Sequence, residues 1–369
     1  MNTERAKILD DRGTVVGLKD EFGLLDRMLA DSKKQPPLYR PGPLWAAKAR
    51  NAANEIRRTG IGSFRGAASQ IGLSFADNLL IDVRDVYNHG YRRILRWLDR
   101  TFPLSRVFEA QLRWTEAHAK ASIAYAEEAL NLKPRTRDLL KRYVVPYSLL
   151  GDCADKATID GKSYSKLYLC LLDRLEIITS RIDLRRVRTV FEIGGGFGAN
   201  IHLLIENFPN IRKILYLDIP PNLYIGTQYL KAFYGSAVVD YDASRTSDSI
   251  RFGHDDSLEI FCIAPWQIEI VATTCDLFTN STSFVEMPPS IVASYAAKVG
   301  GLPNSDDTAI VLSTNDGYDL RLTIAPTELP RFFQGREFQP LEATNLVESW
   351  TKHFYFLSPG KFELPSNKS

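Results

Sequence analysis

The sequence has few cysteines and no long apolar stretch, and both absences limit the classes of protein it encodes. The 369 residues include four cysteines, none in CxxC spacing: Cys153, Cys170, Cys262 and Cys275. This usage excludes a disulfide framework and predicts buried thiols in a reducing cytoplasm. No run approaches the roughly 20 apolar residues that span a bilayer, and residues 1–7 lack the apolar core of a secretory signal. We therefore expect a cytoplasmic protein with no integral membrane segment.

Several catalytic signatures are also missing. The chain has no Walker sequence, no HExxH and no GxSxG, and no group of residues shows metal-ligand spacing. These absences disfavour P-loop nucleotide hydrolysis, zinc peptidase chemistry and serine hydrolysis. We therefore assign no metal ligand, and metal-assisted transfer stays open.

What the sequence does contain is enough apolar material for a sizeable core, with 44% hydrophobic and 11% aromatic residues. The length favours two structural units. Residues 1–150 hold 26 basic and 17 acidic side chains, whereas the remainder holds 20 and 27. We predict a helical N-terminal domain over residues 1–150, serving as an acceptor lid, an oligomerisation surface or both, and a second domain over residues 151–369.

In the second half, short apolar runs alternate with helical segments. The runs lie at residues 188–193, 213–217, 259–263, 274–278 and 309–313. This alternation predicts an α/β fold with a doubly wound, Rossmann-like sheet, preceded by the all-α N-terminal domain. Residues 354–357 are expected to add a last, antiparallel strand.

A glycine-rich turn follows the first of these runs. Glu192, Gly194, Gly195, Gly196 and Gly198 lie between a predicted strand and a predicted helix. Such a turn lets a ligand approach the backbone and the helix N-terminus. Asp218 ends the next strand, where a carboxylate can accept hydrogen bonds from ribose hydroxyls.

The same turn also satisfies the dinucleotide fingerprint, because Gly194, Gly196 and Ala199 have the G-x-G-x-x-A spacing. An NAD(P)-dependent oxidoreductase is therefore the alternative. The acidic Glu192 at the head of the motif and the long region before it favour a methyltransferase instead.

Four blocks, at residues 191–198, 217–224, 264–268 and 276–287, resemble a bacterial family of sugar O-methyltransferases, which are class I enzymes dependent on S-adenosylmethionine (SAM). The resemblance covers about residues 160–300. It implies that Glu192 and the four glycines line the methionine moiety of SAM and that Asp218 holds the ribose. Trp266 and Gln267 would flank the adenine, and Ser283 would border the cofactor.

The resemblance places methyl transfer beside the block at residues 276–287. A sugar hydroxyl is weakly acidic, so a general base would assist its attack. Glu286 is the first candidate, with Asn280 as a polar neighbour and His254 as a second candidate base, for which Asp255 and Asp256 could supply metal help.

The expected activity is transfer of a methyl group to a hydroxyl of a sugar or glycosylated small molecule. A non-sugar natural product as acceptor and a non-catalytic SAM-binding role stay open. Residues 276–279 read Asp-Leu-Phe-Thr where amino-group methyltransferases carry Asn/Asp-Pro-Pro-Tyr/Phe, so no nucleic-acid partner is expected. A homo-oligomer is compatible with the helical half.

Overall fold

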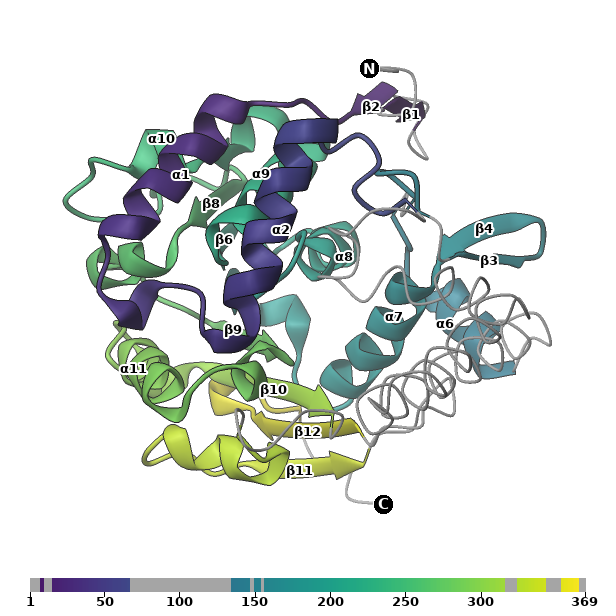
Figure 1. The fold of residues 1–369 in the computed structure, drawn as a ribbon. Helices are drawn as coiled ribbons and strands as arrows, with labels where there is room; N and C mark the ends of the chain where they lie inside the picture. Colours follow the sequence, from purple (N-terminus) through teal and green to yellow (C-terminus); the bar gives the residue numbers. More distant parts are fainter. Residues whose placement is uncertain are drawn as a thin grey trace, which may run out of the picture.

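A mixed eight-stranded sheet forms the centre of the molecule in the computed structural model, which describes residues 7–9, 15–66, 134–146, 149–153, 156–315, 324–342 and 353–364 (Figure 1). The strand order is β11-β12-β10-β9-β5-β6-β8-β7, and β12 runs antiparallel to both of its neighbours. The strands are β5 (Thr189–Ile193), β6 (Lys213–Leu217), β7 (Val238–Val239), β8 (Glu259–Ile263), β9 (Leu277–Ser281), β10 (Ala309–Asn315), β11 (Gln339–Glu342) and β12 (His353–Ser358). This topology confirms the predicted doubly wound sheet and its antiparallel last strand.

One strand begins later than the sequence predicts. The apolar run at residues 274–278 predicts a strand, but β9 spans Leu277–Ser281. The reason is Asp276, whose carboxylate accepts the backbone N–H groups of Arg188 and Thr189 at 2.9 and 3.1 Å. This contact fixes Asp276 against the start of β5. Strand pairing therefore begins at Leu277, one residue after Asp276.

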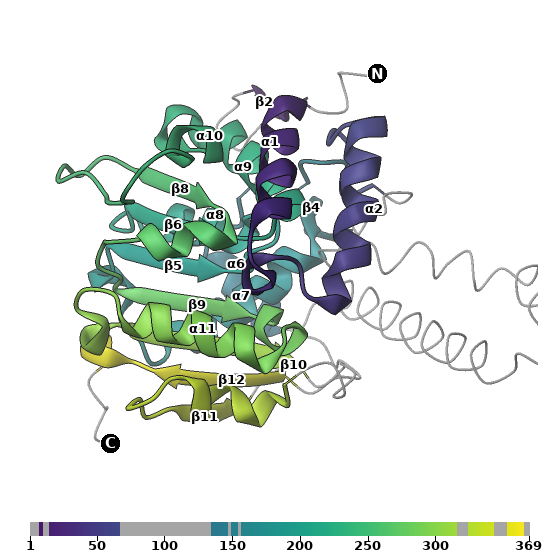
Figure 2. The same ribbon diagram turned by 60° about the vertical axis from the view of Figure 1, so that its left-hand side comes forward.

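Helices cover both faces of the sheet. α7 (Lys166–Thr179), α8 (Ala199–Asn207) and α9 (Pro220–Tyr234) contribute to one apolar cluster, and α11 (Pro289–Gly300) to another (Figure 2). Side chains alternate between these clusters along β5, because successive residues of a strand point to opposite faces. Val190 belongs to the α7 side, whereas Phe191 and Ile193 belong to the α11 side.

The N-terminal helices α1 (Phe22–Lys34) and α2 (Pro43–Thr59) pack against α9. Their buried side chains, such as Leu25 and Ile56, belong to the same cluster as the α7 face of the sheet. Figure 2 shows both helices beside the ends toward which the parallel strands point. The described N-terminal residues therefore share a core with the sheet. Residues 67–133 lie outside the described part, and the domain boundary at residue 150 stays a prediction.

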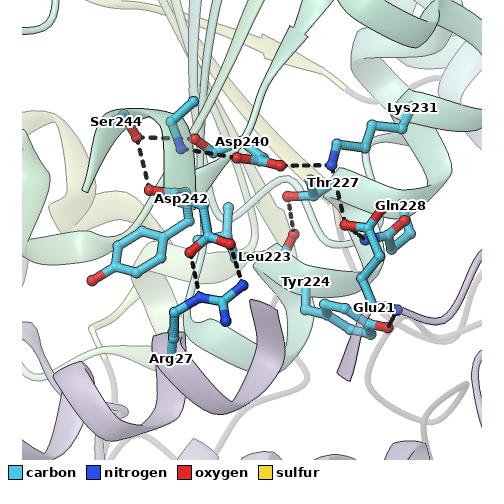
Figure 3. Close-up of polar contacts among 12 residues, drawn as sticks. Glu21, Arg27, Leu223, Tyr224, Thr227, Gln228, Lys231, Asp240, Asp242 and Ser244 are labelled. Atoms are coloured by element: carbon cyan, nitrogen blue, oxygen red, sulfur yellow. Dashed lines mark hydrogen bonds and ion pairs between the residues drawn. The ribbon is translucent and has the colours of Figure 1, made fainter. Parts of the chain in front are cut away.

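Polar contacts fix α1 to α9 and to α10 (Tyr241–Ser244) (Figure 3). The backbone N–H of Glu21 donates to the Tyr224 hydroxyl at 2.8 Å, and the Glu21 carboxylate accepts from Lys231 Nζ at 3.2 Å. Six residues further along the chain, Arg27 of α1 forms an ion pair with Asp242. The described residues also form two antiparallel strand pairs and one further helix. These are β1–β2 (Lys7–Leu9, Val15–Gly17), β3–β4 (Lys156–Ile159, Lys162–Ser165) and α6 (Pro134–Arg142).

Three cysteines are buried as predicted, whereas Cys170 is exposed. Cys170 lies between the buried pairs Tyr168-Leu169 and Leu171-Leu172 of α7, so it falls on the outer face of that helix. Among the described helices, none is long and apolar enough to cross a membrane.

Candidate active site

The candidate site lies where the direction of winding of the sheet reverses. From β5 the chain passes to β6 and the edge strand β7, then to β8 between those two, and returns to β9 on the other side of β5. In open α/β sheets, ligands bind in the crevice at the carboxyl ends of the strands at such a point. The glycine turn follows β5, and Asn280 and Ser283 lie at the end of β9. The structure therefore brings these predicted residues together.

The glycine turn requires glycine for reasons within the protein. Gly194 has φ +74°, and a Cβ there would lie 2.1 Å from Ser283 Oγ. A Cβ on Gly195 would lie 2.7 Å from Glu192 Oε2. Both positions exclude a larger residue before any ligand is considered. The turn thus packs directly on Glu192 and Ser283, and Gly198 (φ +88°) forms the N-cap of α8 without a side-chain cap.

Asp218 holds the glycine turn from the neighbouring strand. Its Oδ2 accepts the Gly196 N–H at 2.8 Å, and its Oδ1 accepts the Ile219 N–H at 2.7 Å. Burial raises the pKa of Asp218 to about 7, and these backbone N–H groups limit the rise because they stabilise the charged form. Each carboxylate oxygen retains a lone pair, so Asp218 can still accept a ligand hydroxyl.

Glu192 is 1% exposed and lies beneath the turn. Its Oε1 accepts from Asn200 Nδ2 of α8 at 2.8 Å. Burial raises its pKa, an effect opposed chiefly by the positive charge of Arg174 on α7. The sequence analysis missed Asn200 and Arg174. A signal for Arg174 did exist, because Asp173 and Arg174 interrupt an otherwise apolar helix face.

Asn280 connects the ends of β9 and β5. Its Nδ2 donates to the Ile193 carbonyl at 2.9 Å and to Ser283 Oγ at 2.6 Å, and its Oδ1 accepts the Phe284 N–H at 3.1 Å. The amide therefore positions the loop after β9. A catalytic role for Asn280 and a cofactor contact for Ser283 stay predictions.

Glu286 ends the short 3₁₀ helix at Ser283–Glu286, on the same edge of the sheet. Its Oε2 accepts from the indole Nε1 of Trp45 at 2.7 Å. Trp45 comes from the first turns of α2, and the hydroxyl of Tyr39, just before that helix, donates to Glu269. The N-terminal segment thus crosses the crevice edge from the loop after β8 to the loop after β9.

Trp266 and Gln267 lie in the 3₁₀ helix Pro265–Ile270 after β8. Gln267 Oε1 accepts the Ala264 N–H at 2.9 Å, and its Nε2 donates to the Ser244 carbonyl at 3.1 Å. Trp266 packs edge-to-face on Tyr241, with ring centroids 5.7 Å apart. Both side chains hold α10 against this loop, and their contact with adenine stays a prediction.

His254 is exposed and precedes β8, so it lies at the amino ends of the strands, opposite the crevice. Its acidic neighbours are engaged there: Asp255 pairs with Lys213 at 3.1 Å, and Asp256 pairs with Arg188. The structure does not bring His254 to the other site residues. Within the described ranges, no cluster of three or more His, Cys, Asp or Glu side chains could hold a metal ion.

Comparison with known proteins gives structural likenesses only. No family model matches the chain, and no curated protein matches it. The mitomycin 7-O-methyltransferase is 13% identical, with 90% of this chain and 99% of that chain covered and a TM-score of 0.34. An O-methyltransferase from Bacillus cereus is 12% identical, covering 50% of this chain and 78% of that one, with a TM-score of 0.32. The human N-acetylserotonin methyltransferase is 13% identical over half of each chain, with a TM-score of 0.29.

The α/β fold rests on the strand order and the reversed β12, and the functional hypothesis rests on the crevice at the ends of β5 and β9.

Proposed function

We propose that the protein is a SAM-dependent O-methyltransferase. The observation that carries this proposal is the joint placement of the glycine turn, Asp218 and Glu192 at the ends of β5 and β6, where Asp218 directly binds the turn. The resemblance of four sequence blocks to sugar O-methyltransferases supports the same activity. Reversal of β12 between β10 and β11 distinguishes the sheet from an all-parallel dinucleotide-binding arrangement.

The crevice fits the chemistry of this cofactor. Asp218 offers carboxylate oxygens to ribose hydroxyls, Glu192 offers negative charge beneath the turn, and the N-cap of α8, Gly198, has no side chain to cap the helix. We assign Glu192 and Gly194, Gly195, Gly196 and Gly198 to the methionine end and Trp266 and Gln267 to the adenine side. When bound, SAM supplies a methyl group already activated on a sulfonium sulfur.

The protein then has to orient an acceptor hydroxyl and hold its proton. Glu286 is the proposed proton acceptor, because its carboxylate lies at the crevice edge and is oriented by the Trp45 indole. We propose a hydroxyl of a sugar or glycosylated small molecule as the acceptor. This choice of acceptor rests on the sequence resemblance. Trp45 beside a carboxylate is compatible with it, since sugars stack their apolar faces on indole rings while their hydroxyls donate to carboxylates.

The deciding experiment is calorimetric titration with S-adenosylhomocysteine (SAH) and, separately, NADH, on the wild-type protein and Asp218→Ala. The proposal expects SAH to bind, Asp218→Ala to weaken that binding, and NADH to give no heat. Binding of NADH without binding of SAH would refute the proposal and support the alternative, an NAD(P)-dependent oxidoreductase that uses the same glycine turn. Once SAH binding is established, a panel of sugar and non-sugar alcohols tests the acceptor class.

A further inference from the structure

A cavity that shares no residue with the crevice lies on the α11 side of the sheet. Its volume is about 390 Å³, within the range of about 300–1,000 Å³ that is usual for small-molecule sites. It is lined by the second half of α11, by residues around the start of β10, and by the end of the 3₁₀ helix Pro326–Phe332 and the residues after it. Because β10 begins at the amino edge of the sheet, the cavity lies away from the carboxyl ends of the strands, where methyl transfer is proposed.

The cavity exists because one face of α11 carries only small residues. Four of them line it at positions i, i+3, i+4 and i+7, a spacing that places them on the same face of the helix. They are Ala293, Ala296, Ala297 and Gly300. A leucine at one of these positions would fill part of the space. The small side chains instead leave a flat wall, and the half-buried ring of Phe332 lines another side.

Two hydroxyl groups in the lining are already satisfied within the protein. The buried Thr308 hydroxyl donates to the Cys275 carbonyl at 2.5 Å. The Ser305 hydroxyl donates to the Gly300 carbonyl at 2.6 Å. Since neither hydroxyl has a proton left to donate, and since Val299, Ile310 and Phe333 also line the cavity, its walls suit an apolar ligand body.

The charged residues of the lining are two arginines and one acid, Asp306. Arg331 is paired with Glu328 at 2.7 Å. Arg336 differs, because its guanidinium donates to backbone carbonyls, from Nη1 to Asp306 at 2.8 Å and from Nη2 to Ser305. These bonds hold the guanidinium in place, and no carboxylate in the described part of the chain lies within ion-pair distance of it. A guanidinium has more N–H donors than these bonds use, so Arg336 can also bind an anion.

We propose that this cavity binds a small aromatic carboxylate, with its ring against the α11 alanines and Phe332 and its carboxylate on Arg336. A flat wall suits a planar ring better than a branched aliphatic chain. A guanidinium matches a carboxylate in both charge and geometry. The inference goes beyond the proposed function and does not depend on it, because none of these residues belongs to the crevice.

The test is calorimetric titration of the full chain with 2-naphthoate and with its uncharged counterpart, 2-naphthalenemethanol. We expect naphthoate to bind at least about tenfold more tightly than the alcohol, because only the carboxylate forms a charge-assisted contact. Arg336→Met should lower naphthoate affinity about tenfold and leave binding of the alcohol within a factor of about three. Arg58→Met is the matched control, since Arg58 is an exposed arginine of α2 and its loss changes the net charge equally. It should leave naphthoate binding unchanged.

Ala297→Leu tests the cavity itself. The larger side chain occupies the space beside α11, so affinity for both ligands should fall at least about tenfold. Ala297 is exposed, so this variant is expected to fold, and it decides the matter if circular dichroism melts show that Arg336→Met does not.

Three results would overturn the inference: no binding of naphthoate to the wild type, equal binding of naphthoate and the alcohol, or naphthoate binding that survives Ala297→Leu. Equal losses in Arg336→Met and Arg58→Met would do the same, because they would reduce the effect to net charge. Displacement of naphthoate by SAH would place the probe in the crevice and would also overturn it. The proposed function is judged separately, by the binding of SAH itself.

Discussion

If Asp218 binds the cofactor as proposed, we expect that binding to depend on pH near neutrality. Its pKa of about 7 means that the carboxyl group is about one-tenth ionised at pH 6 and nine-tenths ionised at pH 8. Ribose hydroxyls donate hydrogen bonds, so the ionised form is the one that binds them well. If only this form binds, SAH affinity should fall about tenfold from pH 8 to pH 6, equivalent to about 1.4 kcal/mol.

Calorimetry can measure this effect in two independent ways. The dissociation constant for SAH should rise as the pH falls, and binding at pH 7 should release about half a proton, seen as a dependence of the heat on the ionisation enthalpy of the buffer. Asp218→Asn should weaken binding and remove both effects. Asp276→Asn is the matched control, because Asp276 also accepts two backbone N–H bonds but lies at the opposite edge. An SAH affinity that is constant from pH 6 to pH 8 would refute the reasoning.

The same carboxyl group affects stability in a defined direction. Its pKa in the folded chain lies above its ordinary value of 3.8, so the folded state binds the extra proton between these values. Its contribution is fully present below about pH 4 and is lost as the pH rises through 7, by about 4 kcal/mol in all. Urea unfolding of Asp218→Asn should lack this part of the pH dependence.

Two further predictions concern the surroundings of the crevice, and a third concerns the cysteines. Asn280→Ala should lower the free energy of unfolding by about 2–4 kcal/mol and weaken SAH binding, because it removes the amide that donates to the Ile193 carbonyl and accepts the Phe284 N–H. Asn210→Ala, which removes an amide that donates to Leu184 and Val187 at the amino edge, should lower stability only; equal SAH affinity in both variants would contradict the assignment of Asn280. A double-mutant cycle of Trp45→Phe and Glu286→Gln should give a coupling free energy of about 1–2 kcal/mol in urea unfolding, and additive losses would mean that the indole does not orient the carboxylate. Titration of the native protein with a thiol reagent should modify Cys170 quickly and the three buried cysteines only on unfolding, whereas fast reaction of more than one thiol would disagree with the burial described.

The sheet and the centre of the site are predictable from sequence because both depend on local patterns. Apolar runs that alternate with helical segments predict the strands, and the glycine spacing after β5 predicts the turn. The place of Asp218 in the site is predictable because it directly follows the next strand. Each of these signals lies within a few residues of the element that it specifies.

The remaining features depend on contacts between distant segments. His254 is a reasonable candidate from its acidic neighbours, but it precedes β8 and so lies at the wrong edge, as the predicted strand at residues 259–263 already implied. Arg174 is one charge in a helix, and its proximity to Glu192 requires the packing of α7 on the sheet. The contact between Trp45 and Glu286 joins residues 241 positions apart, which no local pattern encodes.

The shared core of α1, α2 and α9 also constrains how the chain folds during synthesis. α1 leaves the ribosome first, yet the residues that cover it, such as Tyr224 and Lys231, follow about 200 positions later. At elongation rates of about 5–20 residues per second, α1 waits at least about 10 seconds for its partners. The contacts of α1 with α9 therefore cannot form until that interval has passed. Contacts of such long sequence separation also slow folding itself, because loop closure precedes any gain from packing.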